Sequence, residues 1–70
     1  MPTIDLNGPD GNAFALMGLV RNIGREIGME TKQISRILDE MRHGNYCDLL
    51  NVIDKHFPDI FDFIGDPRDE

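Results

Sequence analysis

The chain has 70 residues, of which 40% are hydrophobic and 29% charged, so it has room for one hydrophobic core and not for two. Its formal net charge of −6 disfavours binding to nucleic-acid phosphates or to an anionic membrane surface. The single cysteine cannot form a disulfide within the chain, and its spacing from the two histidines does not match a metal site. We therefore expect one small domain over residues 1–65, an acidic frayed tail over residues 66–70, and neither a metal nor a cofactor.

The hydrophobic residues are distributed in short groups along the chain. No apolar run approaches the roughly 18 residues that a membrane-spanning helix needs. The first residues also lack the basic and then apolar order of a signal peptide. We therefore expect a cytoplasmic protein that has no membrane partner.

The N-terminal residues indicate a short strand followed by a loop. Residues 3–6 alternate polar and apolar side chains, which is typical of a half-buried strand. Residues 7–12 are all turn-forming types, and they predict a tight loop before the first helix.

Apolar residues then return at helical spacing, which predicts a first helix over about residues 13–27. Asn12 or Asp10 is expected to cap it by accepting a backbone N–H. Gly18 and Gly24 lie inside this helix, where each costs about 1 kcal/mol relative to alanine. Such a cost indicates close backbone approach, either by a neighbouring helix or by a second copy of the chain.

Two further helices are predicted by the same spacing. Gly28 is expected to end the first helix, and a second helix is predicted over residues 31–43 with Thr31 as its cap. A third helix is predicted over residues 45–57, and Pro58 stops it because proline cannot continue the hydrogen-bond ladder.

The segment after the third helix predicts a second strand over residues 60–64. The two end strands can pair as a two-stranded ribbon on a three-helix layer, either within one chain or between protomers. The predicted fold class is therefore mainly α (α+β). We expect the strand's apolar residues and the two helical glycines to form a subunit or target interface, or else to close the core of one chain; these residues are Ile60, Phe61, Phe63, Ile64, Gly18 and Gly24.

The small size of the chain favours association. A domain of this length buries only about 60% of the surface that its unfolded form exposes. Because neither disulfides nor metal add stability, contacts between like subunits are the remaining supplement, and a homo-oligomer is expected.

The loop before the first helix has two interpretations. Its residues can simply form a turn and a helix cap, or they can bind a ligand with help from arginines of another protomer. The loop lacks the lysine and hydroxyl residue of a phosphate-binding P-loop. The residues of this candidate ligand site are Gly8, Asp10, Gly11, Asn12, Arg21 and Arg25.

No set of residues indicates catalysis, and we expect the protein not to be an enzyme. Ser35 and Cys47 have no base placed beside them by the sequence. The second and third predicted helices resemble a helix-turn-helix only loosely, because the third carries mainly acidic residues where a recognition helix carries basic or amide ones. Direct binding to nucleic acid is therefore not expected. Residues 44–70 hold two basic and seven acidic residues, so an acidic imitation of DNA is a further hypothesis.

Two short motifs resemble a group of small uncharacterised proteins of bacteriophages and mobile elements. Residues 10–14 read Asp-Gly-Asn-Ala-Phe, and residues 44–50 read Gly-Asn-Tyr-Cys-Asp-Leu-Leu. Asn45 occupies a position where the group usually has aspartate, and either residue caps a helix well. The resemblance spans about residues 8–50 and brings no assigned activity.

The resemblance implies a phage-type accessory protein in the cytoplasm of a bacterial host cell. A chain of this size without catalytic residues acts by binding another molecule. The leading hypothesis is a homo-oligomer that binds and inhibits or adapts a host protein, as anti-defence proteins do. The alternative is a protein that sequesters a host immune signal by binding a nucleotide-type small molecule. The acidic DNA mimic is the third hypothesis.

Overall fold

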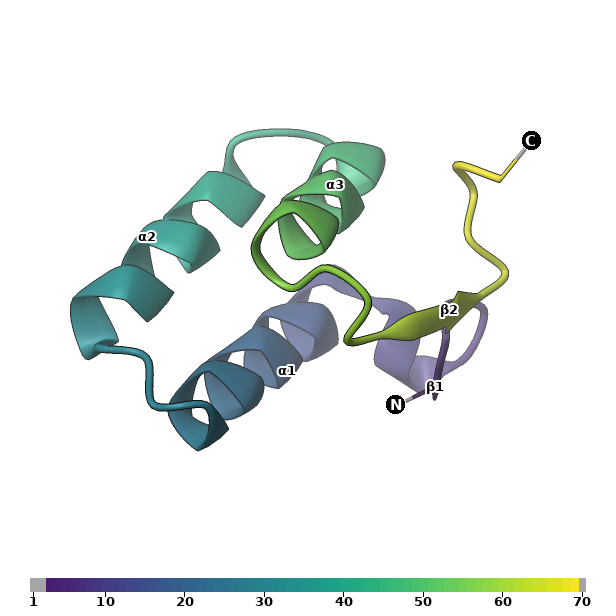
Figure 1. Cartoon of the computed structure of the whole chain (residues 1–70). Coiled ribbons are helices and arrows are strands. Elements are labelled where there is room, and N and C mark those ends of the chain that lie inside the picture. Colours follow the sequence, from purple (N-terminus) through teal and green to yellow (C-terminus); the bar gives the residue numbers. More distant parts are fainter. Residues whose placement is uncertain (1–2, 70) are drawn as a thin grey trace.

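The computed structural model describes residues 3–69, which form three helices with a short strand at each end (Figure 1). This arrangement confirms the predicted mainly α fold with a small sheet. In chain order the elements are β1 (Thr3–Asp5), the 3₁₀ helix η1 (Pro9–Gly11), α1 (Ala13–Glu26), α2 (Thr31–Arg42), α3 (Tyr46–His56) and β2 (Asp62–Ile64).

The two end strands pair with each other inside one chain. They run parallel, and Ile4 lies opposite Phe63 in the register. A parallel pair needs a long crossover connection, and here the three helices supply it. Beyond β1 the Leu6 N–H extends the ladder by donating to the Ile64 carbonyl oxygen at 2.9 Å. The side chains of Ile4 and Phe63 are half-buried and pack against the helical core.

β2 is shorter than the strand predicted over residues 60–64. Residues 58–60 form a turn after α3, in which Asp59 has a positive φ of 60°. Phe61 precedes β2, and its ring stacks on Phe63 with centroids 6.1 Å apart. The same ring meets the buried Phe57 edge-on, with centroids 6.2 Å apart. These aromatic contacts attach the C-terminal segment to the core of its own chain.

Asparagine side chains cap two of the three helices. The Asn12 Oδ1 accepts the Ala15 N–H at 2.8 Å, and the Asn45 Oδ1 accepts the Asp48 N–H at 2.9 Å. The prediction that Thr31 caps α2 is wrong, because the cap is Glu30. Glu30 has an extended backbone, and its N–H donates to the Gln33 Oε1 at 3.1 Å, so the helix begins one residue after Glu30.

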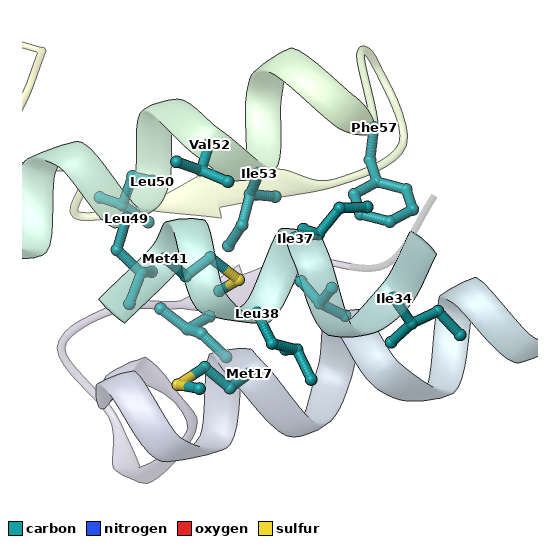
Figure 2. Close-up of a cluster of buried hydrophobic side chains, with 12 residues drawn as sticks. Met17, Ile34, Ile37, Leu38, Met41, Leu49, Leu50, Val52, Ile53 and Phe57 are labelled. Atoms are coloured by element: carbon teal, nitrogen blue, oxygen red, sulfur yellow. The ribbon is translucent and has the colours of Figure 1, made fainter. Parts of the chain in front are cut away.

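The core is made by apolar side chains from all three helices and by Phe57, which directly follows α3 (Figure 2). α2 contacts both α1 and α3 more extensively than those two helices contact each other. Four of its buried residues follow the predicted helical spacing. The buried core residues are Leu16, Met17, Val20, Ile34, Ile37, Leu38, Met41, Leu49, Leu50, Val52, Ile53 and Phe57.

The two glycines inside α1 have different surroundings. A Cβ atom added at Gly24 would lie 2.8 Å from the Cγ1 of Ile34, so α2 approaches the α1 backbone there, as close packing predicts. A Cβ atom added at Gly18 would meet no atom within 4 Å. Packing within one chain therefore explains why Gly24 has no side chain, but it does not explain Gly18.

This difference gives opposite expectations for two alanine substitutions. Gly18→Ala should stabilise the domain by about 0.5–1 kcal/mol, because alanine loses less backbone entropy in a helix than glycine. Gly24→Ala should raise the free energy of unfolding much less than Gly18→Ala does, because Ile34 must move to admit the new methyl group. Urea unfolding of the two variants measures the difference, and a larger gain for Gly24→Ala would contradict the described packing.

Residues 66–69, which fall in the segment predicted to be a frayed tail, lie against α3 through Arg68. The Arg68 guanidinium donates to Asn51 at 2.9 Å and forms ion pairs of 2.6 Å with both Asp54 and Asp66. The hydrogen bonds from Arg68 lower the pKa of the Asp66 carboxyl below its ordinary value. One basic side chain thus pairs with two of the acidic residues in the last third of the chain.

Candidate functional site

An apolar groove lies where the start of α1 meets the corner between α2 and α3. It encloses about 390 Å³. The buried side chains of Met17, Met41 and Leu49 form its floor, and Phe14 and Tyr46 stand beside them. We call this feature the Phe14 groove.

Phe14 is the most exposed large hydrophobic residue among residues 3–69. Its side chain is 86% exposed, whereas Phe57 in the core is 1% exposed. Burying a phenylalanine side chain stabilises a protein by about 1.5–3 kcal/mol, and the fold of one chain does not gain this stabilisation from Phe14. An exposed aromatic beside an apolar groove is typical of a surface that binds another molecule.

Tyr46 connects the two segments that build the groove. Its hydroxyl donates a hydrogen bond to the Gly11 carbonyl oxygen, which holds the loop before α1 against the first turn of α3. Burial of the hydroxyl raises the pKa of Tyr46, so the phenol stays neutral and keeps its donor proton. Two segments that are far apart in the sequence, residues 10–14 and 44–50, therefore meet at the Phe14 groove.

A second groove, of about 230 Å³, runs between α1 and α2. Arg21, Arg25 and Arg42 line it, together with the hydroxyl side chains of Thr31 and Ser35. Among residues 3–69, none of these arginines forms an ion pair with a carboxylate. We call this feature the arginine groove; Arg42 lines both grooves, so the two adjoin.

The predicted ligand site is not assembled within one chain. Gly8, Asp10, Gly11 and Asn12 form or flank η1, where Gly11 is buried. The Asn12 side chain is engaged as the α1 cap and also donates to the Pro9 carbonyl oxygen at 2.9 Å.

The two predicted arginines lie elsewhere on α1. From the rise of an α-helix, Arg21 and Arg25 lie about 14 Å and about 20 Å along the axis from Asn12. They face the arginine groove and not the loop.

The residues predicted as an interface have varied surroundings. Ile60, Phe61 and Phe63 are half-buried and pack on the core of their own chain. Ile64 is 53% exposed at the end of β2. Gly24 faces Ile34, and Gly18 lies on an open part of α1.

Of the residues that line the two grooves, only Arg21 and Arg25 belong to the predicted ligand site. Sequence reasoning missed Phe14, Tyr46 and Arg42, and also the Thr31 and Ser35 hydroxyls. Phe14 and Tyr46 have the helical spacing of core residues, and Arg42 lies far from Arg21 in the sequence. One local signal was available for Phe14. It precedes Arg21 by seven residues and Arg25 by eleven, which places it on the same face of α1 as two charged side chains.

Metal-binding clusters and membrane spans are both lacking in the described part of the chain. Between residues 3 and 69, no group of three or more histidine, cysteine, aspartate or glutamate side chains is arranged to hold a metal ion. No helix in that range combines the length and the apolar character required to cross a membrane.

Comparison of the chain with protein-family models, with curated proteins and with solved structures finds no match in any of the three.

Proposed function

We propose that this chain is a non-enzymatic, phage-type accessory protein that acts by binding a host protein through the Phe14 groove. The observation that supports this proposal most directly is the 86% exposure of Phe14 beside an apolar groove of about 390 Å³. A partner can cover Phe14 and place an apolar side chain of its own in the groove.

The composition of this surface resembles the centre of a protein interface. Such centres are rich in aromatic residues, methionine and arginine, and they are poor in acidic residues. Phe14, Met17, Tyr46 and Arg42 line the groove, and no acidic side chain lines it among residues 3–69. Protein capture is therefore better supported here than acidic DNA mimicry, because this surface presents an arginine and no acidic side chain within residues 3–69.

The surface is also held in one shape before a partner arrives. The Asn12 and Asn45 caps fix the first turns of α1 and α3, and the Tyr46 hydrogen bond joins α3 to the loop before α1. A partner then orders few groups on binding, which lowers the entropic cost of association.

The test is capture of host proteins on immobilised protein, with quantification by mass spectrometry. Phe14→Ala should reduce recovery of the specific partner at least tenfold, because truncating an aromatic hot spot typically costs more than about 1.4 kcal/mol. Ile27→Ala is the matched control, since Ile27 is also an exposed hydrophobic residue, 58% exposed, and lines neither groove. The control should retain the partner.

The homo-oligomer expected from chain length belongs to the same proposal and needs a separate measurement. Sedimentation equilibrium of the wild type and of Phe14→Ala distinguishes loss of a host partner from loss of self-association. Binding through the Phe14 groove would be contradicted if the wild type and Phe14→Ala captured the same amount of host protein. It would also be contradicted if the wild type enriched no host protein.

A further inference from the structure

We infer that the arginine groove between α1 and α2 is a binding site for a small ligand that carries several phosphate groups. This site differs from the one expected from the sequence, because it uses Arg42, Thr31 and Ser35 of the same chain and not the loop at residues 8–12. The inference does not depend on the protein-binding role proposed for the Phe14 groove.

The distribution of charge points to an anion. The chain has 13 acidic and 7 basic residues, yet three arginines and no acidic residue line this groove within residues 3–69. Of the other four basic residues, Lys55 is paired with Glu40 and Arg68 with Asp54 and Asp66, whereas Lys32 and Arg36 form no ion pair within residues 3–69. Arginine stays charged at every physiological pH, so the mutual repulsion of the three groove arginines is relieved only by a bound anion or by solvent.

The length of the groove points to an extended anion. Arg21 and Arg25 are one turn apart on the same face of α1. Thr31 and Arg42 lie at opposite ends of α2, about 17 Å apart by the helical rise. A single phosphate cannot reach both ends of this groove, whereas a nucleoside polyphosphate has a comparable length.

The remaining lining suits such a ligand. The Thr31 and Ser35 hydroxyls lie one helical turn apart and can donate hydrogen bonds to phosphate oxygens. Ile34 and Leu38 are buried beneath them and provide an apolar floor on which a flat organic group can rest. Guanidinium groups bind phosphate through two parallel hydrogen bonds, so arginine is well suited to this task.

The net charge favours a short ligand over a long polyanion. Residues 44–70 carry seven acidic and two basic residues, and a nucleic-acid strand that extends beyond the groove meets this negative field. The lining of the groove lies wholly in α1 and α2, outside this acidic segment, so a small polyphosphate can bind there without contacting it.

Isothermal titration calorimetry at low salt tests the inference with ADP and ATP as probes, because both are long enough to extend along the groove. The wild type should bind at least one of them, and Arg21→Ala, Arg25→Ala and Arg42→Ala should each weaken binding at least tenfold. Arg36→Ala is the matched control. It removes the same charge from the exposed surface of α2, but Arg36 lines a different groove that contains Glu40.

Additional variants and probes distinguish the arginine groove from the Phe14 groove and from a site for long polyanions. Phe14→Ala should leave phosphate binding unchanged, so failure of the protein-binding proposal is distinguishable from failure of this one. Absence of binding to both probes at millimolar concentration would overturn the inference. An equal loss of affinity in Arg36→Ala would also overturn it. Tighter binding of a single-stranded oligonucleotide or of polyglutamate than of the nucleotide probes would do the same.

Discussion

Leu50→Asp is expected to unfold the domain. Leu50 lies in the middle of α3 and has no exposed surface. The substitution removes a buried leucine, worth about 2–5 kcal/mol, and places a carboxylate among apolar side chains that offer it no partner. A small domain of this length has a total stability of about 4–10 kcal/mol, at 0.05–0.15 kcal/mol per residue. The combined loss is comparable with that total.

Circular dichroism and urea unfolding provide the measurement, and Phe14→Asp provides the control. Phe14 is also an apolar residue on a helix, but its side chain is 86% exposed, and an acidic residue in the first turn of α1 interacts favourably with the helix dipole. We expect Phe14→Asp to change the free energy of unfolding by less than about 1 kcal/mol. A cooperative transition of Leu50→Asp near the wild-type midpoint would be incompatible with the described core.

Gly11→Ala is expected to destabilise the domain by about 1–3 kcal/mol, the usual cost of forcing a group into a well-packed site. A Cβ atom at Gly11 would lie 2.2 Å from the Leu6 carbonyl oxygen and 2.6 Å from the Leu6 Cα. Both are backbone atoms, so the loop between β1 and α1 must shift to admit the methyl group. Because the Gly11 carbonyl accepts the Tyr46 hydrogen bond, the shift also disturbs the Phe14 groove.

Gly8→Ala is the matched control in the same loop. A Cβ atom at Gly8 would lie 3.5 Å from the nearest atom, the Asp5 carbonyl oxygen, which is an ordinary contact. Its φ of −95° and ψ of −174° suit any residue, so the free energy of unfolding should change by less than about 0.5 kcal/mol or rise slightly. Equal urea midpoints for the Gly8 and Gly11 variants would contradict the close approach of Leu6 to Gly11.

The two proposed binding surfaces share one side of the helical unit. Phe14, Arg21 and Arg25 lie along one face of α1, and Arg42 of α2 lines both grooves. A ligand that draws the Arg42 side chain toward Arg21 therefore changes the rim of the Phe14 groove. Titration of the captured host partner with and without ADP measures this coupling directly, since two linked sites change each other's affinity by the same factor.

The helices and their ends were largely determined by local sequence. The spacing of Ile34, Ile37, Leu38 and Met41 is sufficient to predict the buried face of α2, because helical periodicity depends only on neighbouring residues. The cap of α1 was predicted as Asn12 or Asp10 from the side-chain types before the helix, and the structure shows Asn12. The cap of α2 was predicted wrongly because Glu30 and Thr31 both lie at the start of the helix. The hydrogen bond from the Glu30 N–H to the Gln33 side chain identifies Glu30 as the cap.

Tertiary structure alone decided the parallel pairing of the end strands and the composition of both grooves. Residues 3–5 and 62–64 are compatible with pairing in either direction or between chains, and only the path through the three helices brings them together in parallel. Phe14 has the spacing of a core residue, yet α2 and α3 pack on the adjacent face of α1 and leave it exposed. Arg42 joins Arg21 because α1 and α2 lie side by side. Periodicity identifies which residues share a helix face, whereas the packing of one helix on another decides which faces are covered.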